Sequence, residues 1–353
     1  MKQEWETGAR EIYFAAANSG EGFISYYGEI FEKEGIRKRY ILQGGPGTGK
    51  SSFMRRIAEH AEERGMRTVY YSCSSDPDSL DGVILDGRIA VLDGTAPHTV
   101  ELRYPGARDE IVNLGEFWDG DALSRCYNEI VSLCALKESA YRRAYRFLSA
   151  AMEVSCANRE RVIPALRMAK MEAAAERLGR QIPEGEGYSL TPAPITSLGM
   201  KGSVRLDTYE RRARKRYIVD DLYGMGSYFL LQMLQIARQK RCAVTVSYQL
   251  LEPSLPEAVF FSESGICFAM GVEGDAAWEG RVNMKRFVAA EMLSDVKAEL
   301  RINRRLQDAL QTSAEEALAD AGRYHFELER IYASCMDFEA LGKFTRSFCQ
   351  KIG

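Results

Sequence analysis

The sequence Arg39-Tyr-Ile-Leu-Gln-Gly-Gly-Pro-Gly-Thr-Gly-Lys-Ser-Ser-Phe-Met54 decides the fold of the N-terminal half of the chain. It begins as a short apolar strand and continues through a glycine-rich segment into an amphipathic helix. The segment Gly44-Gly-Pro-Gly-Thr-Gly-Lys-Ser51 matches the eight-residue pattern of a phosphate-binding loop, with the strand before it and the helix after it that such a loop requires. The sequence therefore predicts a P-loop in an α/β fold.

The residue types in this loop make phosphate its expected ligand. Glycines let the backbone turn tightly and aim successive N–H groups at phosphate oxygens, and the following helix adds its positive N-terminal end. Lys50 would reach the β and γ phosphates, and the Ser51 hydroxyl would bind Mg²⁺. A glycine-rich turn with a structural role is the alternative. The candidate nucleotide-binding residues are Gly45, Pro46, Gly47, Thr48, Gly49, Lys50, Ser51 and Ser52.

An acidic residue at the end of another apolar strand is the expected partner of this loop. Ile89-Ala-Val-Leu-Asp93 supplies it, and Asp93 would hold Mg²⁺ directly or through water. Aspartate also suits turns, so the strand end alone is a weak signal. Ser51 and Asp93 are thus the candidate metal ligands, and ATP or GTP with Mg²⁺ is the expected ligand.

Two aspartates and a histidine are further candidates for catalysis. Asp76 and Asp81 follow the second predicted strand, at the edge where ligands collect in open α/β sheets, and either could orient an attacking nucleophile. Asp76 precedes Pro77, so a helix N-cap is the competing interpretation. His98 lies just past Asp93 and could sense the γ phosphate, with an ordinary loop histidine as the alternative.

The chain repeats itself once, at an offset of 177 residues. Lys38-Arg-Tyr-Ile41 recurs as Lys215-Arg-Tyr-Ile218, and both copies predict the same β-α-β-β order. Two unrelated α/β domains that share a tetrapeptide are the alternative. The predicted elements are strand 39–43, helix 50–64 and strands 67–73 and 88–92 in the first copy, and 216–219, 228–239, 243–249 and 266–270 in the second.

Long helical sequence follows each α/β core. Apolar residues between Leu123 and Ala151 recur mostly every three or four positions, which predicts a helix packed along one seam. A second helix follows to about Arg180, and the sequence from Leu293 to Phe338 predicts a similar pair.

The boundary between the halves lies near residue 187. The segment Gln181 to Pro194 is rich in proline and glycine and is the natural linker. We expect a P-loop NTPase domain with a helical extension over residues 1–186 and a degenerate P-loop-like domain with C-terminal helices over 187–353. Each domain is expected to contain a mostly parallel sheet.

The second copy lacks the phosphate-binding chemistry. We expect it to keep the fold, to bind no Mg-nucleotide in the same way, and to pack against the first half as a pseudo-dimer. The replacements at the offset of 177 are Asp221 for Gly44, Ser227 for Lys50, Tyr228 for Ser51 and Met270 for Asp93.

A basic cluster, Arg211-Arg-Ala-Arg-Lys-Arg216, opens the second copy. Its default interpretation is a solvated entry to a strand. An arginine from it could instead reach across to the γ phosphate, a contribution of roughly 10³ to 10⁵ in rate where it occurs. A nucleic-acid contact is the third possibility.

The bulk composition indicates a globular cytoplasmic protein. The 353 residues include 46% hydrophobic and 27% charged residues, with a formal net charge of −3, which gives no global field for binding nucleic acid. The N-terminus lacks the pattern of a signal peptide, and no apolar run approaches the ~20 residues that span a bilayer. The eight cysteines and three histidines are scattered and predict no zinc site.

Four motifs resemble those of an uncharacterised family of tandem P-loop "ATPase" proteins from anaerobic, often spore-forming Firmicutes. The resemblance covers nearly the whole chain and implies nucleotide binding. In similar proteins the second half also has an intact loop, so Ser227 and Tyr228 depart from the pattern. The motifs are Phe14-Ala-Ala-Ala-Asn-Ser-Gly-Glu-Gly22, Gly44-Gly-Pro-Gly-Thr-Gly-Lys-Ser51, Cys73-Ser-Ser-Asp-Pro-Asp-Ser-Leu-Asp-Gly82 and Asp93-Gly-Thr-Ala-Pro-His98.

The function expected from the sequence is Mg-dependent nucleotide hydrolysis, with ATP favoured, coupled to movement between the halves or their helical arms. Lys50, Ser51 and Asp93 would carry it by positioning and charge stabilisation. A small-molecule or nucleotide kinase that uses the same site is the main alternative. A nucleotide-dependent binding switch is the third. The sequence identifies no protein partner.

Overall fold

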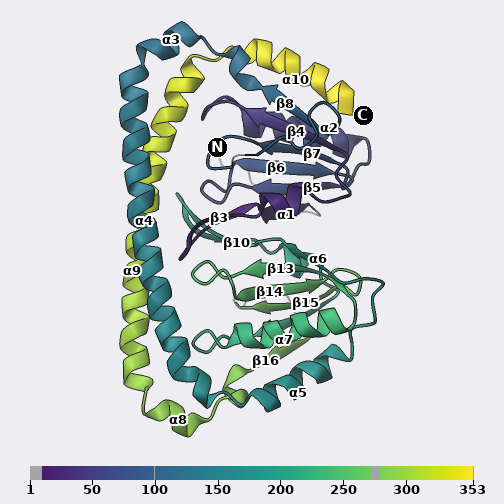
Figure 1. Ribbon diagram of the computed structural model, residues 1–353, viewed down its shortest axis with the longest axis vertical. Helices are drawn as coiled ribbons and strands as arrows, with labels where there is room; N and C mark the ends of the chain where they lie inside the picture. The colour runs from purple at the N-terminus through teal and green to yellow at the C-terminus, as the bar shows by residue number, and fades with distance from the viewer. Residues whose placement is uncertain (1–9, 99, 272–277, 353) are drawn as a thin grey trace.

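A computed structural model describes residues 10–98, 100–271 and 278–352 of the chain. It shows two α/β lobes, one above the other, flanked on one side by a long arm of two helices (Figure 1). Residues 1–9, on which the expectation of no signal peptide rests, lie outside the described range.

The first lobe contains the predicted strand, glycine-rich loop and helix, together with strands that the sequence analysis did not identify. Its main sheet has the order β1-β5-β6-β7-β4-β8, and β2 and β3 form a separate hairpin. The elements are β1 (Glu11–Phe14), β2 (Ala16–Ser19), β3 (Gly22–Ser25), α1 (Tyr27–Phe31), β4 (Lys38–Gln43), α2 (Lys50–Glu63), β5 (Thr68–Ser72), β6 (Leu80–Leu85), β7 (Ile89–Asp93) and β8 (Asp109–Asn113).

The second lobe has the same order of elements. Its main sheet reads β9-β13-β14-β15-β12-β16, which matches the first sheet strand for strand and is consistent with a duplicated α/β fold. The elements are β9 (Ser189–Pro192), β10 (Thr196–Gly199), β11 (Gly202–Arg205), α6 (Thr208–Arg212), β12 (Lys215–Val219), α7 (Gly226–Gln239), β13 (Ala243–Tyr248), β14 (Pro256–Phe261), β15 (Ile266–Met270) and β16 (Gly280–Val282).

Both sheets are mixed, because one strand in each, β6 or β14, is antiparallel to its neighbours, but the other strands all run in the same direction, so the expectation of mostly parallel sheets is confirmed. β6 is antiparallel to β5 and to β7, while the remaining three pairings of the first sheet are parallel. The reason is a tight hairpin between β6 and β7. Asp86 and Gly87 have φ angles of 46° and 66°, and Arg88 N donates to Leu85 O at 2.9 Å, as in the primed turns that join antiparallel strands.

Long helices extend from both lobes. α4 and α9 lie antiparallel along one side of the molecule (Figure 1) and pack through small residues that include Ala144, Ala151, Ala314 and Ala317. The elements outside the two lobes are η1 (Leu114–Phe117), α3 (Gly120–Arg125), α4 (Tyr127–Val162), η2 (Ile163–Ala165), α5 (Met168–Gly179), η3 (Met284–Phe287), α8 (Ala290–Ser294), α9 (Lys297–Ser334) and α10 (Phe338–Ile352).

The two halves exchange their last helices. α10, from the C-terminal half, packs on α2 of the first lobe, where the rings of Phe53 and Phe348 lie 5.1 Å apart. α5, from the N-terminal half, packs on α7 of the second lobe, with Met171 in the same apolar cluster as Met233. Residue 187 therefore divides the sequence into two copies, but α5 and α10 each complete the core of the other copy.

The exchange is stabilised in the same way at both ends of the molecule. Asp337 N donates to Phe117 O at 2.7 Å, and Arg167 N donates to Phe287 O at 2.7 Å. These pairs are equivalent at an offset of 170, the offset that also relates η1 to η3 and the start of α4 to the start of α9. The helical parts of the repeat are therefore aligned seven positions differently from the α/β cores.

The two lobes share an apolar interface. Tyr13 and Tyr27 of the first lobe belong to one buried cluster with Ile195, Tyr209 and Phe260 of the second. The intramolecular contact between the halves is thus part of the hydrophobic core, and the halves bury each other's apolar surface.

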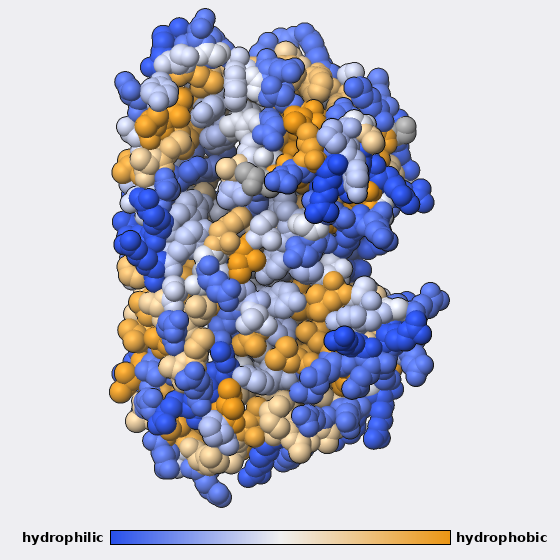
Figure 2. Space-filling view, in the orientation of Figure 1, coloured by the Kyte–Doolittle hydropathy of each residue, from blue (hydrophilic) through white to orange (hydrophobic). Residues whose placement is uncertain are grey.

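The surface is mostly hydrophilic, with apolar areas along the side of the arm (Figure 2). Leu136 on α4 and Leu306 on α9 are 47% and 49% exposed and occupy equivalent positions of the repeat. Among the described residues, no helix combines the length and the apolar composition of a membrane span.

Candidate functional site

The glycine-rich loop follows β4 and leads into α2, as the sequence predicts. Gly47 and Gly49 have φ angles of 70° and 83°, in the left-handed region that favours glycine. Among the described residues, the amides of Gly47, Gly49 and Lys50 meet no hydrogen-bond acceptor. The loop therefore presents backbone N–H groups at the N-terminus of a 14-residue helix, where an anion is favoured.

Lys50 points back into this loop. Its Nζ donates to the carbonyl oxygens of Gly44 and Gly45 at 2.7 and 2.9 Å and lies 3.6 Å from Asp93 Oδ2. The side chain is only 11% exposed. Because charged oxygens form stronger hydrogen bonds than neutral carbonyls, phosphate oxygens would be better partners for this ammonium group than the two loop carbonyls.

The remaining side chains of the loop differ in what they can offer a ligand. Ser51 Oγ accepts a hydrogen bond from the amide of Leu80 at 3.0 Å and keeps a second lone pair for another partner. Thr48 is buried, and its hydroxyl donates to Gly45 O at 2.8 Å. Pro46 is half-buried and Ser52 is exposed.

Asp93 ends β7 beside the loop, because β7 pairs in parallel with β4. Its Oδ1 accepts hydrogen bonds from the amide and the hydroxyl of Thr95 at 2.8 and 2.6 Å. Burial raises the pKa of the Asp93 carboxyl, an effect that Lys50 and Thr95 oppose and the nearby Asp81 carboxylate reinforces. Oδ2, which faces Lys50, is the oxygen left for a ligand.

The donor set fits Mg²⁺ that arrives with a nucleotide. Among the described residues, no group of three or more histidine, cysteine, aspartate or glutamate side chains could hold a metal ion unaided. Mg²⁺ in nucleotide sites takes one or two protein oxygens and completes its octahedron with phosphate and water. The Ser51 hydroxyl and the Asp93 carboxylate are oxygen donors of that kind.

Asp81 and His98 form a buried pair. His98 Nε2 lies 3.4 Å from Asp81 Oδ2, and the two residues are 7% and 4% exposed. The imidazole stacks on the ring of Tyr27 at 4.3 Å. Asp81 Oδ2 and His98 Nδ1 have no hydrogen-bond partner within the described part of the chain, which is costly for buried polar atoms unless a ligand or water supplies one. The structure thus brings together two of the residues that the sequence analysis named as candidates for catalysis.

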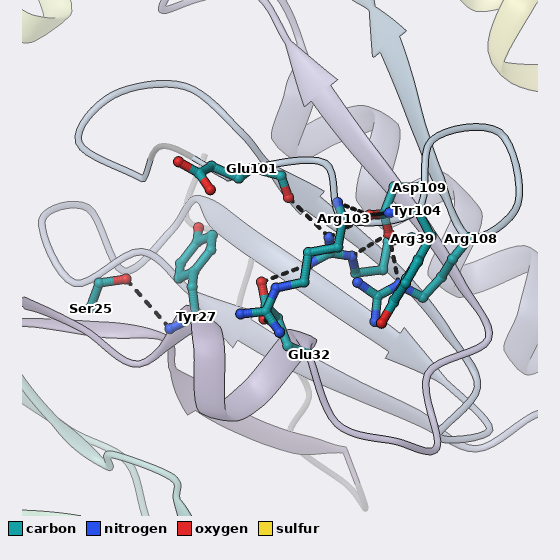
Figure 3. A network of polar contacts seen from close by, with 9 residues as sticks. All are labelled: Ser25, Tyr27, Glu32, Arg39, Glu101, Arg103, Tyr104, Arg108 and Asp109. Carbon is teal, nitrogen blue, oxygen red and sulfur yellow. Dashed lines mark hydrogen bonds and ion pairs between the residues drawn. The ribbon is translucent and has the colours of Figure 1, made fainter.

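The loop that carries His98 is anchored by a buried ion-pair network (Figure 3). Arg39 donates to both carboxylate oxygens of Asp109 at 2.7 and 2.8 Å and to the carbonyl of Glu101 at 3.2 Å. The amide of Arg103 also donates to Asp109, at 2.7 Å. These hydrogen bonds tie the chain between His98 and β8 to the start of β4.

Asp76 takes part in hydrogen bonds that hold two segments of the chain together. It accepts hydrogen bonds from Lys201 Nζ at 2.6 Å and from the Ser79 hydroxyl at 2.8 Å, and these bonds lower its pKa although burial works in the opposite direction. No helix begins at Pro77, because the chain turns at Ser79 and enters β6. The helix N-cap interpretation of Asp76 is therefore wrong. Lys201 comes from the second lobe, so the residue joins the two halves.

Arg211 and Arg212, the first two arginines of the basic cluster, do not reach the glycine-rich loop. Arg211 donates to Asp207 at 2.7 Å and to the carbonyl of Arg10, and Arg212 pairs with Glu11 at 3.0 Å. Glu11 begins β1, which runs parallel to β4, so these arginines lie at the sheet edge opposite to the loop. The hypothesis that Arg211 or Arg212 reaches the γ phosphate is not supported by this arrangement.

Two residues of the second half that do lie at the loop belong to α9. A β-carbon on Gly47 would lie 2.5 Å from the carbonyl oxygen of Glu329, and one on Gly45 would lie 2.8 Å from the Tyr332 ring. Both residues are near the end of α9. The sequence analysis missed this contact because a helical pattern does not show which lobe a helix packs against.

The second copy of the loop contains its own anion. The Asp221 carboxylate accepts hydrogen bonds from the amides of Gly224 and Gly226 at 3.1 and 3.2 Å. Ser227, at the position of Lys50, is buried and donates to Pro256 O at 2.6 Å. At the offset of 177, Gly224 and Gly226 correspond to Gly47 and Gly49. The amides that donate to a carboxylate in the second copy therefore have no acceptor among the described residues in the first.

Comparison of the chain with models of protein families, with curated proteins and with solved structures found no match.

Proposed function

We propose that the chain binds a Mg-nucleoside triphosphate, with ATP favoured, at Gly44 to Ser51 and hydrolyses it. The observation that carries this proposal is the difference between the two loops. In the second loop, the Asp221 carboxylate accepts hydrogen bonds from the amides of Gly224 and Gly226. The equivalent amides of the first loop, those of Gly47 and Gly49, meet no acceptor among the described residues. An anion is built into one loop and has to be supplied to the other.

Lys50 would bind the β and γ phosphates. Its ammonium group would exchange the carbonyls of Gly44 and Gly45 for phosphate oxygens, which are stronger acceptors. The Asp93 carboxylate, 3.6 Å from Lys50 Nζ, would hold the ammonium group beside the loop. The loop amides and this ammonium group would together stabilise the charge that develops on the transferring phosphoryl group.

Mg²⁺ would neutralise charge on the β and γ phosphates when it is bound with the nucleotide. Ser51 Oγ and Asp93 would hold it. The buried pair of Asp81 and His98 would orient the attacking water, because His98 Nδ1 has no hydrogen-bond partner among the described residues and Asp81 Oδ2 has there only its 3.4 Å contact with His98 Nε2.

A nucleotide-dependent binding switch is the second candidate. The contact between Gly47 and the backbone of Glu329 favours it, because a change in loop conformation on nucleotide binding would move the end of α9. Hydrolysis would then reset the switch, or would be absent.

The test is an equilibrium titration of the purified full chain with Mg-ATP, followed by measurement of phosphate release. We expect one nucleotide per chain and slow release without any acceptor. Lys50→Ala should weaken binding by about 100-fold or more, because it removes charge-assisted hydrogen bonds from a mostly buried site. Lys215→Ala, which changes an exposed lysine of the second lobe, is the matched control and should bind as the wild type does.

The outcomes separate the candidates. Two nucleotides per chain would contradict the account of the second loop. Binding without turnover would favour the switch, and transfer only to an added acceptor would favour a kinase. Full affinity of Lys50→Ala for Mg-ATP would place the phosphate site elsewhere and overturn the proposal.

A further inference from the structure

A surface hollow of about 530 Å³ lies where the end of η1 meets the junction of α9 and α10. In Figure 1 this is the end of the molecule that carries α3 and α10. Trp118, Asp119 and Asp337 are among its lining residues. We propose that this hollow holds the nucleoside of the nucleotide whose phosphates bind at Gly44 to Ser51, an inference that rests on the function proposed above.

Tyr332 connects the hollow to the loop. Its Cε1 lies 2.8 Å from the position of a β-carbon on Gly45, so the ring is in contact with the loop backbone. The centroid of the same ring lies 5.9 Å from that of Trp118. A ligand that extends out of the phosphate loop along Tyr332 would therefore enter the hollow.

The lining residues suit the two parts of a nucleoside. The Trp118 indole is 36% exposed and offers a flat apolar face on which a base can stack. Asp119 and Asp337 each use one carboxylate oxygen to cap a helix, accepting the amides of Ala122 and Ala340 at 2.9 Å. The other oxygens meet no donor among the described residues and can accept hydrogen bonds from ribose hydroxyls or from the amino group of a base.

The acidic lining also favours one orientation of the ligand. Carboxylates repel a polyphosphate and attract hydroxyl and amino donors. The phosphates would therefore stay in the loop beside Lys50, and the uncharged nucleoside would occupy the hollow.

The internal repeat supplies an independent comparison. At the offset of 170, the equivalents of Trp118, Asp119 and Asp337 are Val288, Ala289 and Arg167. The aromatic face and both carboxylates are therefore missing at the end of the molecule whose loop has lost its lysine. Because the backbone hydrogen bonds around the two junctions are the same, such a junction forms without an aromatic ring or a carboxylate at these positions, and the helix caps account for only one oxygen of each carboxylate. Their presence beside the intact loop indicates a role with its ligand.

The experiment titrates the full chain with Mg-ATP, Mg-GTP and Mg-tripolyphosphate, which has the phosphates and lacks the nucleoside. The wild type should bind the preferred nucleotide more tightly than tripolyphosphate. Trp118→Ala should weaken nucleotide binding by about 10- to 100-fold and leave tripolyphosphate binding unchanged, because a stacked base is lost and the phosphate loop is untouched.

Asp337→Asn is the second variant, because asparagine keeps the helix cap and removes the charge. It should weaken nucleotide binding and leave tripolyphosphate binding unchanged, even if Trp118→Ala folds poorly. Arg167→Ala changes the equivalent exposed position at the other end of the molecule and should bind both ligands as the wild type does.

The results distinguish this inference from the function on which it rests. Equal affinity of the wild type for nucleotide and tripolyphosphate, or equal effects of both variants on the two ligands, would overturn the nucleoside site and leave the phosphate site standing. Failure of the wild type to bind any of the three ligands would overturn both.

Discussion

The carbonyl oxygen of Glu329 lies 2.5 Å from the place where a β-carbon on Gly47 would sit. A helix that begins in the second half of the chain therefore rests directly on the glycine-rich loop of the first. Gly47 is required twice, by its positive φ angle and by this close approach. Because of this contact, we expect a conformational change in the loop to shift the end of α9.

Replacing Gly47 should reveal the energy of this contact. In Gly47→Ala, the alanine has to adopt an unfavourable positive φ angle, and its methyl group would also clash with the backbone of Glu329 in α9. Gly65→Ala is the matched control, because Gly65 has a φ of 77° and open space around it. We expect Gly47→Ala to lower the free energy of unfolding by about 1–3 kcal/mol more than Gly65→Ala does in denaturant titrations. Equal losses would show that α9 moves aside freely.

Asp93→Asn should separate binding from turnover. Asparagine can still accept the hydrogen bonds from Thr95, so the end of β7 should keep its shape. If Asp93 binds Mg²⁺ as proposed, loss of the carboxylate removes a metal ligand, and Mg-dependent phosphate release should fall about 100-fold or more while ATP is still bound. Asp86→Asn, in the β6–β7 turn, is the control and should keep full turnover. Unchanged turnover of Asp93→Asn would remove Asp93 from the site.

His98→Phe should slow hydrolysis without weakening nucleotide binding. The phenyl ring keeps the stacking on Tyr27 but has no nitrogen to face Asp81. If His98 helps to orient water, phosphate release should fall on the order of 100-fold. Tyr27→Phe removes only a hydroxyl that donates to the Asp81 backbone and should stay within a few fold of the wild type. Parallel losses in both variants would mean that the pair is structural.

Asp109→Asn should destabilise the protein and change its response to acid. Hydrogen bonds from Arg39 hold the pKa of Asp109 well below its ordinary value of 3.8. Because the folded-state pKa is depressed, the stabilisation is fully present above the unfolded-state value near 3.8 and is lost as the pH falls below it. At neutral pH, loss of the buried ion pair between Arg39 and Asp109 should lower the free energy of unfolding by about 3–5 kcal/mol.

The measurement for Asp109 is the free energy of unfolding as a function of pH. The variant should lose less stability than the wild type as the pH falls below 4, in keeping with the ordinary carboxyl value of 3.8. Glu101→Gln is the control, because its carboxylate points away from Arg39 in Figure 3. Identical pH profiles of the wild type and Asp109→Asn would exclude the network as a source of acid sensitivity.

The elements that were predicted correctly are those with strong local signals. The strand before Gly44, the helix after it and the strand that ends at Asp93 are all present, and so is the long helix α4. β6 was missed, although Asp86-Gly87 is a hairpin signal of the kind that marks tight antiparallel turns. The sequence analysis consequently placed Asp81 in the segment that follows the second predicted strand, whereas it lies in β6 and is buried.

The sequence by itself determined the duplicated order of elements and the glycine-rich loop with Lys50, Ser51 and Asp93, because these depend on local periodicity and on residue types at fixed spacing. Only the tertiary structure decided that α5 and α10 change places and that Glu329 and Tyr332 cover the loop. An amphipathic helix has to bury its apolar face, but two similar lobes offer two similar surfaces. The choice between them is made by the length and direction of α4 and α9, which no local pattern records.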